Sequence, residues 1–272
     1  MSTPAFADAA PSSAARAAEV WASLGSVTDP ELDEPVTELR FVTGIEVDAE
    51  GRVHIGFRLP TYWCAANFAF LMADDMRAAV SSLPWVRQVT VDLRDHMYSD
   101  TINQGLARGH SFKATFAEEA ADEDLDELRR TFRIKAYQRR QEAVIRHLLD
   151  RGWAVTDILD LDLPHLATLP IADPETLKLR DRYLEIRREW GGTSDNAFTS
   201  AEGEPVTPAT FGEYLSLLRR VRINTEFNGH LCRGLLQARY DDAPTEGEPT
   251  LADFIAGRVA KREMGGHDQC RK

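Results

Sequence analysis

Apolar and polar residues alternate along a stretch near the start of the chain. Within residues 52–59 every second residue is apolar, namely Val53, Ile55, Phe57 and Leu59. This period of two predicts a strand with one buried face. Pro60 ends the strand, because proline has no N–H to donate to a sheet. After a tight turn, apolar residues recur at helical spacing from Phe68 to Val80, so Cys64 lies where a strand gives way to a helix.

The neighbouring segments complete a small domain around this junction. The pattern of residues 14–24 predicts a short helix. Residues 41–47 read as a strand that a hairpin turn at residues 48–51 joins to the strand before Cys64. Alternation returns in residues 85–93 and predicts a third strand. The order helix, strand, strand, helix, strand is typical of a compact α+β domain.

The remaining two thirds of the chain predict helices. Residues 103–116 are interpreted as a connector, and a long helix is expected over residues 122–150, with its run of arginines on a solvated face. A capping residue followed by proline opens further helices at Asp173 and at Thr207. Thr250 caps a last helix that ends near residue 264.

The predicted fold class is therefore α+β, with a small N-terminal α-β-β-α-β domain followed by a mostly α-helical region. We expect a disordered N-terminus at residues 1–15, which are rich in alanine, serine and proline. The small domain is expected over residues 16–106, and the helical extension over residues 107–272.

Composition narrows the class of protein. The net charge of −12 argues against a nucleic acid or an anionic membrane as partner. No apolar run approaches the length of about 18 residues that would span a bilayer, and the first residues lack the features of a signal peptide. The three cysteines are too few, and odd in number, for a disulfide framework. We therefore expect a cytoplasmic protein with free thiols.

Cys64 is the first candidate for chemistry. Unpaired N–H groups and the dipole at a helix N-terminus favour a thiolate, the form that attacks electrophiles or binds a soft metal. The alternative is a small buried apolar residue, which is a common role of a free cysteine. Upstream, five acidic residues fall within residues 29–38. The first of them, Asp29, also fits a turn or a helix cap.

A second stretch, residues 224–232, combines other candidate ligands. Glu226 and His230 stand one helical turn apart, a spacing at which two side chains can share a ligand. Cys232 is close in sequence but rotated away from them on an unbroken helix. Core packing of Cys232 and a surface Glu–His pair is the alternative. This stretch is nevertheless the best place to find ligands that Cys64 lacks.

Three short motifs carry a resemblance to a known family. They are the sequence Asp-Pro-Glu-Leu at residues 29–32, Thr61 with Cys64 after a strand, and the closing strand at residues 86–93. In this order they resemble the PaaD/SufT-type metal–sulfur (iron–sulfur) cluster assembly domain, over about residues 20–106. The chain departs from the family pattern at Pro60, Tyr62 and Ala65, and the first motif is extended by two acidic residues.

The resemblance implies a factor that matures iron–sulfur or iron enzymes and is not itself an enzyme. It implies a transient metal or cluster site that draws on Cys64, Asp29 and Glu31, to which His230 and Cys232 could add ligands. The same face would bind a partner through Thr61, Tyr62 and Trp63. The expected partner is a client metalloenzyme, with an iron-dependent oxygenase as our first choice. The predicted strands have few residues that would prevent pairing at the edge of a sheet, so a homodimer is also possible.

Two other functions are compatible with the same residues. A metal-free adaptor or chaperone would dock a client through the same face, and the departures from the family pattern favour it. Bulky Tyr62 and Trp63 could form its docking hot spot. An enzyme with Cys64 as nucleophile needs a base, and neither His54 nor His96 is a convincing one.

Overall fold

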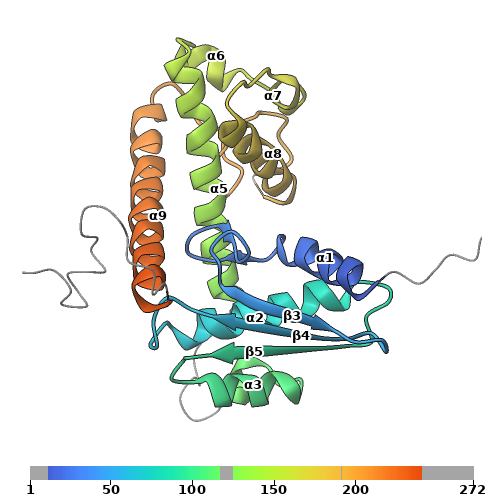
Figure 1. Ribbon diagram of the computed structural model, residues 1–272. Helices are drawn as coiled ribbons and strands as arrows, with labels where there is room; N and C mark the ends of the chain where they lie inside the picture. Colours follow the sequence, from blue (N-terminus) through green and yellow to red (C-terminus); the bar gives the residue numbers. More distant parts are fainter. Residues whose placement is uncertain (1–11, 117–124, 191, 241–272) are drawn as a thin grey trace, which may run out of the picture.

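The computed structural model describes residues 12–116, 125–190 and 192–240. The chain forms a small domain, residues 12–116, which contains the sheets, and a helical region, residues 125–240, which stands over it (Figure 1). The predicted α+β fold is confirmed, with its small N-terminal α-β-β-α-β domain and its mostly helical second part. Among the described residues, no helix is both long and apolar enough to cross a membrane.

The small domain is built around strand β4. Its main elements are α1 (Ser13–Leu24), β3 (Val42–Val47), β4 (Arg52–Arg58), α2 (Ala66–Ser81) and β5 (Gln88–Arg94). Strand β4 lies at the centre of the sheet, antiparallel to β3 and parallel to β5. The alternation along β4 is confirmed, because Val53, Ile55 and Phe57 are buried in a core that α1 and α2 share.

Two features of the small domain differ from the expectations. The acidic segment forms a miniature antiparallel pair, β1 (Thr28–Asp29) with β2 (Glu34–Pro35). The stretch interpreted as a connector, residues 103–116, instead holds the second half of α3 (Ser99–Ala107) and all of α4 (Phe112–Thr115). These helices form because their apolar residues join the core, where Ile102, Leu106, Phe112 and Phe116 are buried.

The helical region contains five labelled helices within its described residues. They are α5 (Leu125–Asp150), α6 (Val155–Leu159), α7 (Leu163–Thr168), α8 (Pro174–Glu189) and α9 (Phe211–Tyr240). The predicted cap at Asp173 is confirmed, since its side chain accepts the N–H of Thr176 at 2.8 Å. Helix α9 begins a turn later than expected and runs unbroken. The helix expected over residues 250–264 lies outside the described residues.

A second hydrophobic core belongs to the helical region. It packs α5, α8 and α9 around a buried polar network in which Gln141 donates to the hydroxyl of Tyr183 at 2.7 Å and to the carbonyl of Thr199 at 2.9 Å. Tyr214 completes it by donating to Gln141 at 2.6 Å. Satisfied buried polar groups of this kind make a core specific in its packing.

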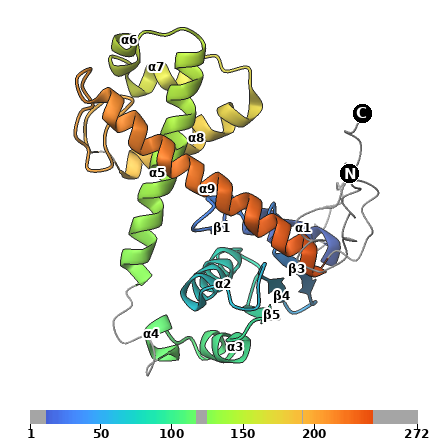
Figure 2. The same ribbon diagram turned by 90° about the vertical axis from the view of Figure 1, so that its left-hand side faces the viewer.

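Helix α9 connects the two parts of the molecule. It begins in the helical region and ends beside the small domain (Figure 2). Near its end, Leu236 is buried in the core of the small domain, and Cys232 packs against the same core. The last part of the described chain therefore covers a face formed by its first part.

Candidate cysteine site

Cys64 lies in the loop between β4 and α2, two residues before the first residue of the helix. Its Sγ atom is 3.1 Å from the hydroxyl oxygen of Thr61. The N-cap of α2 is Ala65, which has no polar side chain to satisfy the first N–H groups of the helix. The predicted position of Cys64 beside a helix N-terminus is thus confirmed, and its thiol is free and half-buried.

His96 fixes the backbone of this loop. Its Nδ1 atom accepts the N–H of Tyr98 at 3.2 Å, so Nε2 carries the proton and donates to the carbonyl of Cys64 at 2.7 Å. Burial lowers the pKa of His96, and the neighbouring Arg239 lowers it further. Both ring nitrogens are engaged with backbone, so His96 positions Cys64 and is not oriented as a base toward its sulfur.

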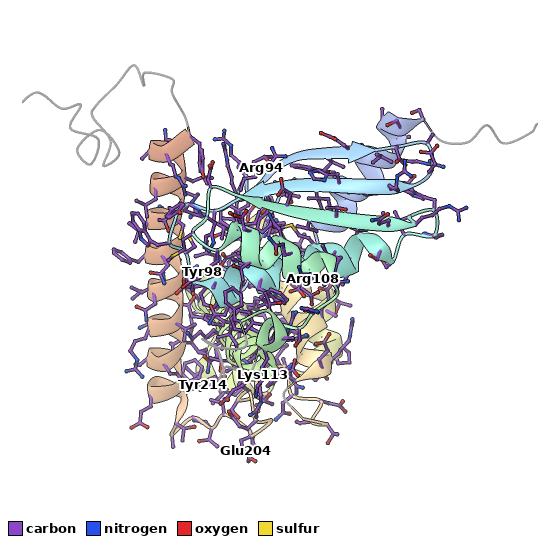
Figure 3. The ribbon with its side chains drawn as sticks, turned by 90° about the horizontal axis from the view of Figure 1, so that it is seen from below. Arg94, Tyr98, Arg108, Lys113, Glu204 and Tyr214 are labelled. Atoms are coloured by element: carbon purple, nitrogen blue, oxygen red, sulfur yellow. The ribbon has the colours of Figure 1, made fainter. Side chains whose placement is uncertain are left out.

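The cysteine loop lies on the side of the small domain that α9 approaches. In the view from below, Tyr98 is labelled on the side along which α9 runs, and Arg108, beyond the end of α3, is labelled farther from that helix (Figure 3). From the sequence, His96 was a candidate only for a base. Its positioning role has no local signature, because Cys64 lies 32 residues away in the chain.

Asp29 lies on β1 and is buried. Its Oδ1 atom accepts the N–H groups of Glu31 and Leu32, both at 2.9 Å. Burial raises the pKa of Asp29 to about 6, against the opposing effect of these two hydrogen bonds. The interpretation of Asp29 as a turn-capping residue is confirmed, and its carboxyl group changes charge near neutral pH.

Helix α9 brings a second thiol to this neighbourhood. Burial raises the pKa of Cys232 to about 12, and the negative charges of Asp29, Cys64 and Glu31 contribute to the rise. Asn228, one turn earlier on the same helix, donates to Glu31 Oε1 at 3.0 Å. Cys64 and Cys232 thus pack against the same core, and the α9 side that carries Cys232 also reaches the acidic segment through Asn228.

His230 does not join this group. It follows Asn228 and precedes Cys232 by two residues each, which places it about 200° around the helix from both. Its side chain is exposed. Glu226, one helical turn before His230, accepts a hydrogen bond from Arg222 at 2.8 Å.

Tyr62 and Trp63 point outward beside Cys64. Their exposed fractions are 51% and 73%, which is unusual for aromatic side chains and marks a surface that a partner could cover. The backbone of the same turn is held from the β5–α3 connection, because the N–H of Met97 donates to the carbonyl of Tyr62 at 2.9 Å. Met97 is itself 48% exposed and extends the apolar surface.

The donor set fits a soft or borderline cation only in part. Thiolate sulfur and carboxylate oxygen together suit iron or zinc, and a closed site needs about four ligands. Within the part of the chain that the structure describes, no three His, Cys, Asp or Glu side chains are grouped so as to hold a metal ion. The two thiols can therefore supply at most part of the ligand set of a cation, and a stable site needs further ligands.

Comparisons with known proteins concern the small domain. A family model described as iron-sulfur cluster assembly protein matches residues 17–93. An uncharacterized protein of Methanocaldococcus jannaschii is 30% identical to this chain over 88 residues, which are 32% of this chain and 90% of that protein. A crystal structure of a domain of unknown function, DUF59, from Bacillus anthracis covers 30% of this chain and 76% of its own, at 23% identity and a TM-score of 0.29.

The part matched by the family model contains Asp29, Glu31, Thr61 and Cys64 but ends long before Cys232. The second thiol is thus an addition of the helical region to the family's domain. A general role in iron–sulfur cluster assembly follows from the match. Through its small domain, this chain belongs to the family of iron–sulfur cluster assembly proteins.

Proposed function

We propose that this protein is a maturation factor that transiently holds iron or an iron–sulfur cluster as cargo and passes it to a client metalloenzyme. Cys64 is the primary ligand and Cys232 the second. The observation that carries the proposal is that Cys64 and Cys232, from distant segments, pack against the same core, while α9 also contacts Glu31 of the acidic segment.

The chemistry of these groups suits short-lived binding. The raised pKa of Cys232 means that its thiol is protonated at neutral pH, so a cation has to displace a proton in order to bind. Asp29, with a pKa of about 6, is largely ionised at pH 7 and can offer an oxygen. An incomplete ligand set leaves room for ligands of the client, and exchange of ligands is how cargo would leave.

The client docks through the apolar surface of Tyr62, Trp63 and Met97 beside the cysteine. Such exposed aromatic groups supply much of the free energy of protein association. Our first choice of client is an iron-dependent oxygenase. Homodimerisation of the factor stays a prediction.

A metal-free adaptor is the second candidate function. It is favoured by the incomplete ligand set and by the exposure of Trp63. In this case the small domain presents the same surface to a client, and Cys64 only packs beneath it.

Anaerobic reconstitution with ferrous iron and sulfide distinguishes the two candidates. We expect the wild-type chain to retain iron after desalting, Cys64→Ser to lose it, and Cys232→Ser to retain less. His230→Ala, a change of a candidate ligand on the far side of α9, serves as the matched control and should load like the wild type. Iron and sulfide per chain are measured directly. Absence of iron from the wild type, under conditions that load a known carrier, rejects the carrier and leaves the adaptor.

A further inference from the structure

The small domain and the helical region are in contact but have separate hydrophobic cores. Each has its own hydrophobic core, and the element pairs whose backbones pack most closely lie within one part or the other. A cavity of about 580 Å³ lies between them, lined by the acidic segment and α2 on one side and by α5 and α8 on the other. Long side chains span this gap.

The main connection across the gap is Asp33. Its backbone has a φ of 54°, which turns the segment between β1 and β2 sharply. Its buried carboxylate receives hydrogen bonds from Arg140 at 2.5 and 2.8 Å and from Arg182 at 2.8 Å, and Arg139 lies 3.5 Å away. The prediction that the arginine run of α5 lies on a solvated face is therefore wrong for Arg139 and Arg140, which contact Asp33 of the small domain.

Further polar pairs extend this connection around the cysteine site. On the α9 side, Arg233 donates to Glu34 at 2.7 Å, and Arg239 donates to the carbonyl of Asp95 at 2.6 Å. Apolar contacts also cross between the two parts. Leu236 at the end of α9 is buried in the small-domain core, and Phe132 of α5 packs edge-to-face on Phe68 of α2 with ring centroids 5.0 Å apart. We call the polar contacts between the two parts, including Asp33 and its arginines, the polar latch.

A latch of this composition resists separation less than an apolar interface of equal area. When the two parts move apart, each ion of the latch returns to water, so the hydration lost on closure is recovered. Partly exposed pairs such as Arg233 with Glu34 contribute little, and salt weakens them. Interfaces of this kind between parts of one chain permit relative motion.

We propose that the helical region is a movable cover over the cysteine site, and that opening the polar latch both exposes Cys64 and withdraws Cys232 from it. Closed, the site has two thiols. Open, each part keeps one thiol, and Cys64 is left accessible to the ligands of a partner. The role of this movement in releasing cargo rests on the proposed function, whereas the movement itself is a property of the metal-free chain.

Thiol alkylation of the full-length, metal-free protein tests the cover. The rates of modification of Cys64 and Cys232 by N-ethylmaleimide are followed by peptide mass spectrometry. Arg233→Glu replaces the partner of Glu34 by a like charge and should speed modification of both thiols about two- to fivefold, as expected from loss of an ordinary ion pair. Added salt should speed modification of the wild type in the same direction.

A charge swap and a matched control make the test decisive. Combining Arg233→Glu with Glu34→Arg should restore slow modification, because the pair is re-formed with reversed signs. Arg52→Glu breaks an exposed ion pair with Asp48 that lies within the hairpin and does not cross the gap, and it should leave both rates unchanged. If neither Arg233→Glu nor added salt changes the modification rates of the two thiols, the proposal of a movable cover is wrong. It is also wrong if the double variant does not restore slow modification, or if Arg52→Glu speeds modification as much as Arg233→Glu does. Iron loading is measured separately, so either proposal can fail alone.

Discussion

At the scale of single residues, His96 and Asp29 respond to pH in opposite directions. Both side chains are buried, His96 next to the cysteine loop and Asp29 on β1. Burial favours the neutral form of each. For His96 the neutral form is the deprotonated one, and for Asp29 it is the protonated one. The stability of the small domain near pH 6 is therefore a balance of the two, which single substitutions can separate.

The pKa of His96 is lowered from the ordinary value of 6.5. Its contribution to stability is therefore complete above that value and is lost as the pH falls through the folded-state pKa. We expect His96→Gln to remove this part of the pH dependence, so that the free energy of unfolding of the variant falls less than that of the wild type between pH 7 and pH 5. Urea unfolding at several pH values measures it. An unchanged pH dependence would contradict the assigned tautomer and its two hydrogen bonds.

The contribution of Asp29 to the free energy of unfolding depends on pH in the opposite direction. Its pKa is raised from 3.8 to about 6, so its contribution is complete below 3.8 and is lost as the pH rises through about 6. Asp29→Asn should therefore raise the free energy of unfolding at pH 7.5, by up to about 3 kcal/mol, with no gain near pH 3.5. Asp48→Asn is the matched control, because hydrogen bonds from Arg52 lower the pKa of Asp48, and its substitution should not stabilise the protein at any pH.

At the scale of elements, α9 shows what a sequence pattern can and cannot predict. The helix was expected from its opening at Thr207, and it runs unbroken to Tyr240. Its contacting side is formed by Thr225, Gly229, Cys232 and Leu236, which recur every three or four residues. The rotation of Cys232 away from His230 follows from helix geometry alone. That this side meets Cys64 depends on tertiary packing, which the periodicity of one helix does not contain.

The end of α9 should depend on one apolar side chain. Leu236 is buried in the small-domain core, so Leu236→Ala should lower the free energy of unfolding by about 2 kcal/mol or more and speed hydrogen exchange in the last turns of α9. Leu217→Ala, at an exposed position of the same helix, should change neither quantity appreciably. Equal effects of the two substitutions would show that Leu236 is not anchored in the core.

At the scale of the whole molecule, the acidic segment explains the departure from the family motif. Asp33 and Glu34, which extend the first motif, both contact the helical region, Asp33 at α5 and α8 and Glu34 at α9. Their partners lie between 107 and 199 residues away in the chain. Strands, caps and the position of Cys64 were predictable because they depend on neighbours in sequence. Pairs across such separations leave no local pattern in the sequence. The contacts of the acidic segment with the helical region were therefore not predictable.

Asp33 should be the most sensitive residue of this connection. Asp33→Ala removes a buried carboxylate and leaves three arginines without their common partner, which should lower the free energy of unfolding by about 3 kcal/mol. Glu38→Ala removes another carboxylate of the same segment, whose pair with Lys178 is exposed, and should have little effect. Thermal unfolding of both variants measures the difference, and similar melting temperatures would contradict the central place of Asp33.

The distance between the two thiols in the sequence also sets an order of events during synthesis. Cys232 follows Cys64 by more than half the length of the chain, and domains fold in the order in which they leave the ribosome. A nascent small domain thus carries one thiol and no cover. The two-thiol form comes into being only when α9 has been made and has folded back, so under the proposed function a chain would retain cargo only after α9 is in place.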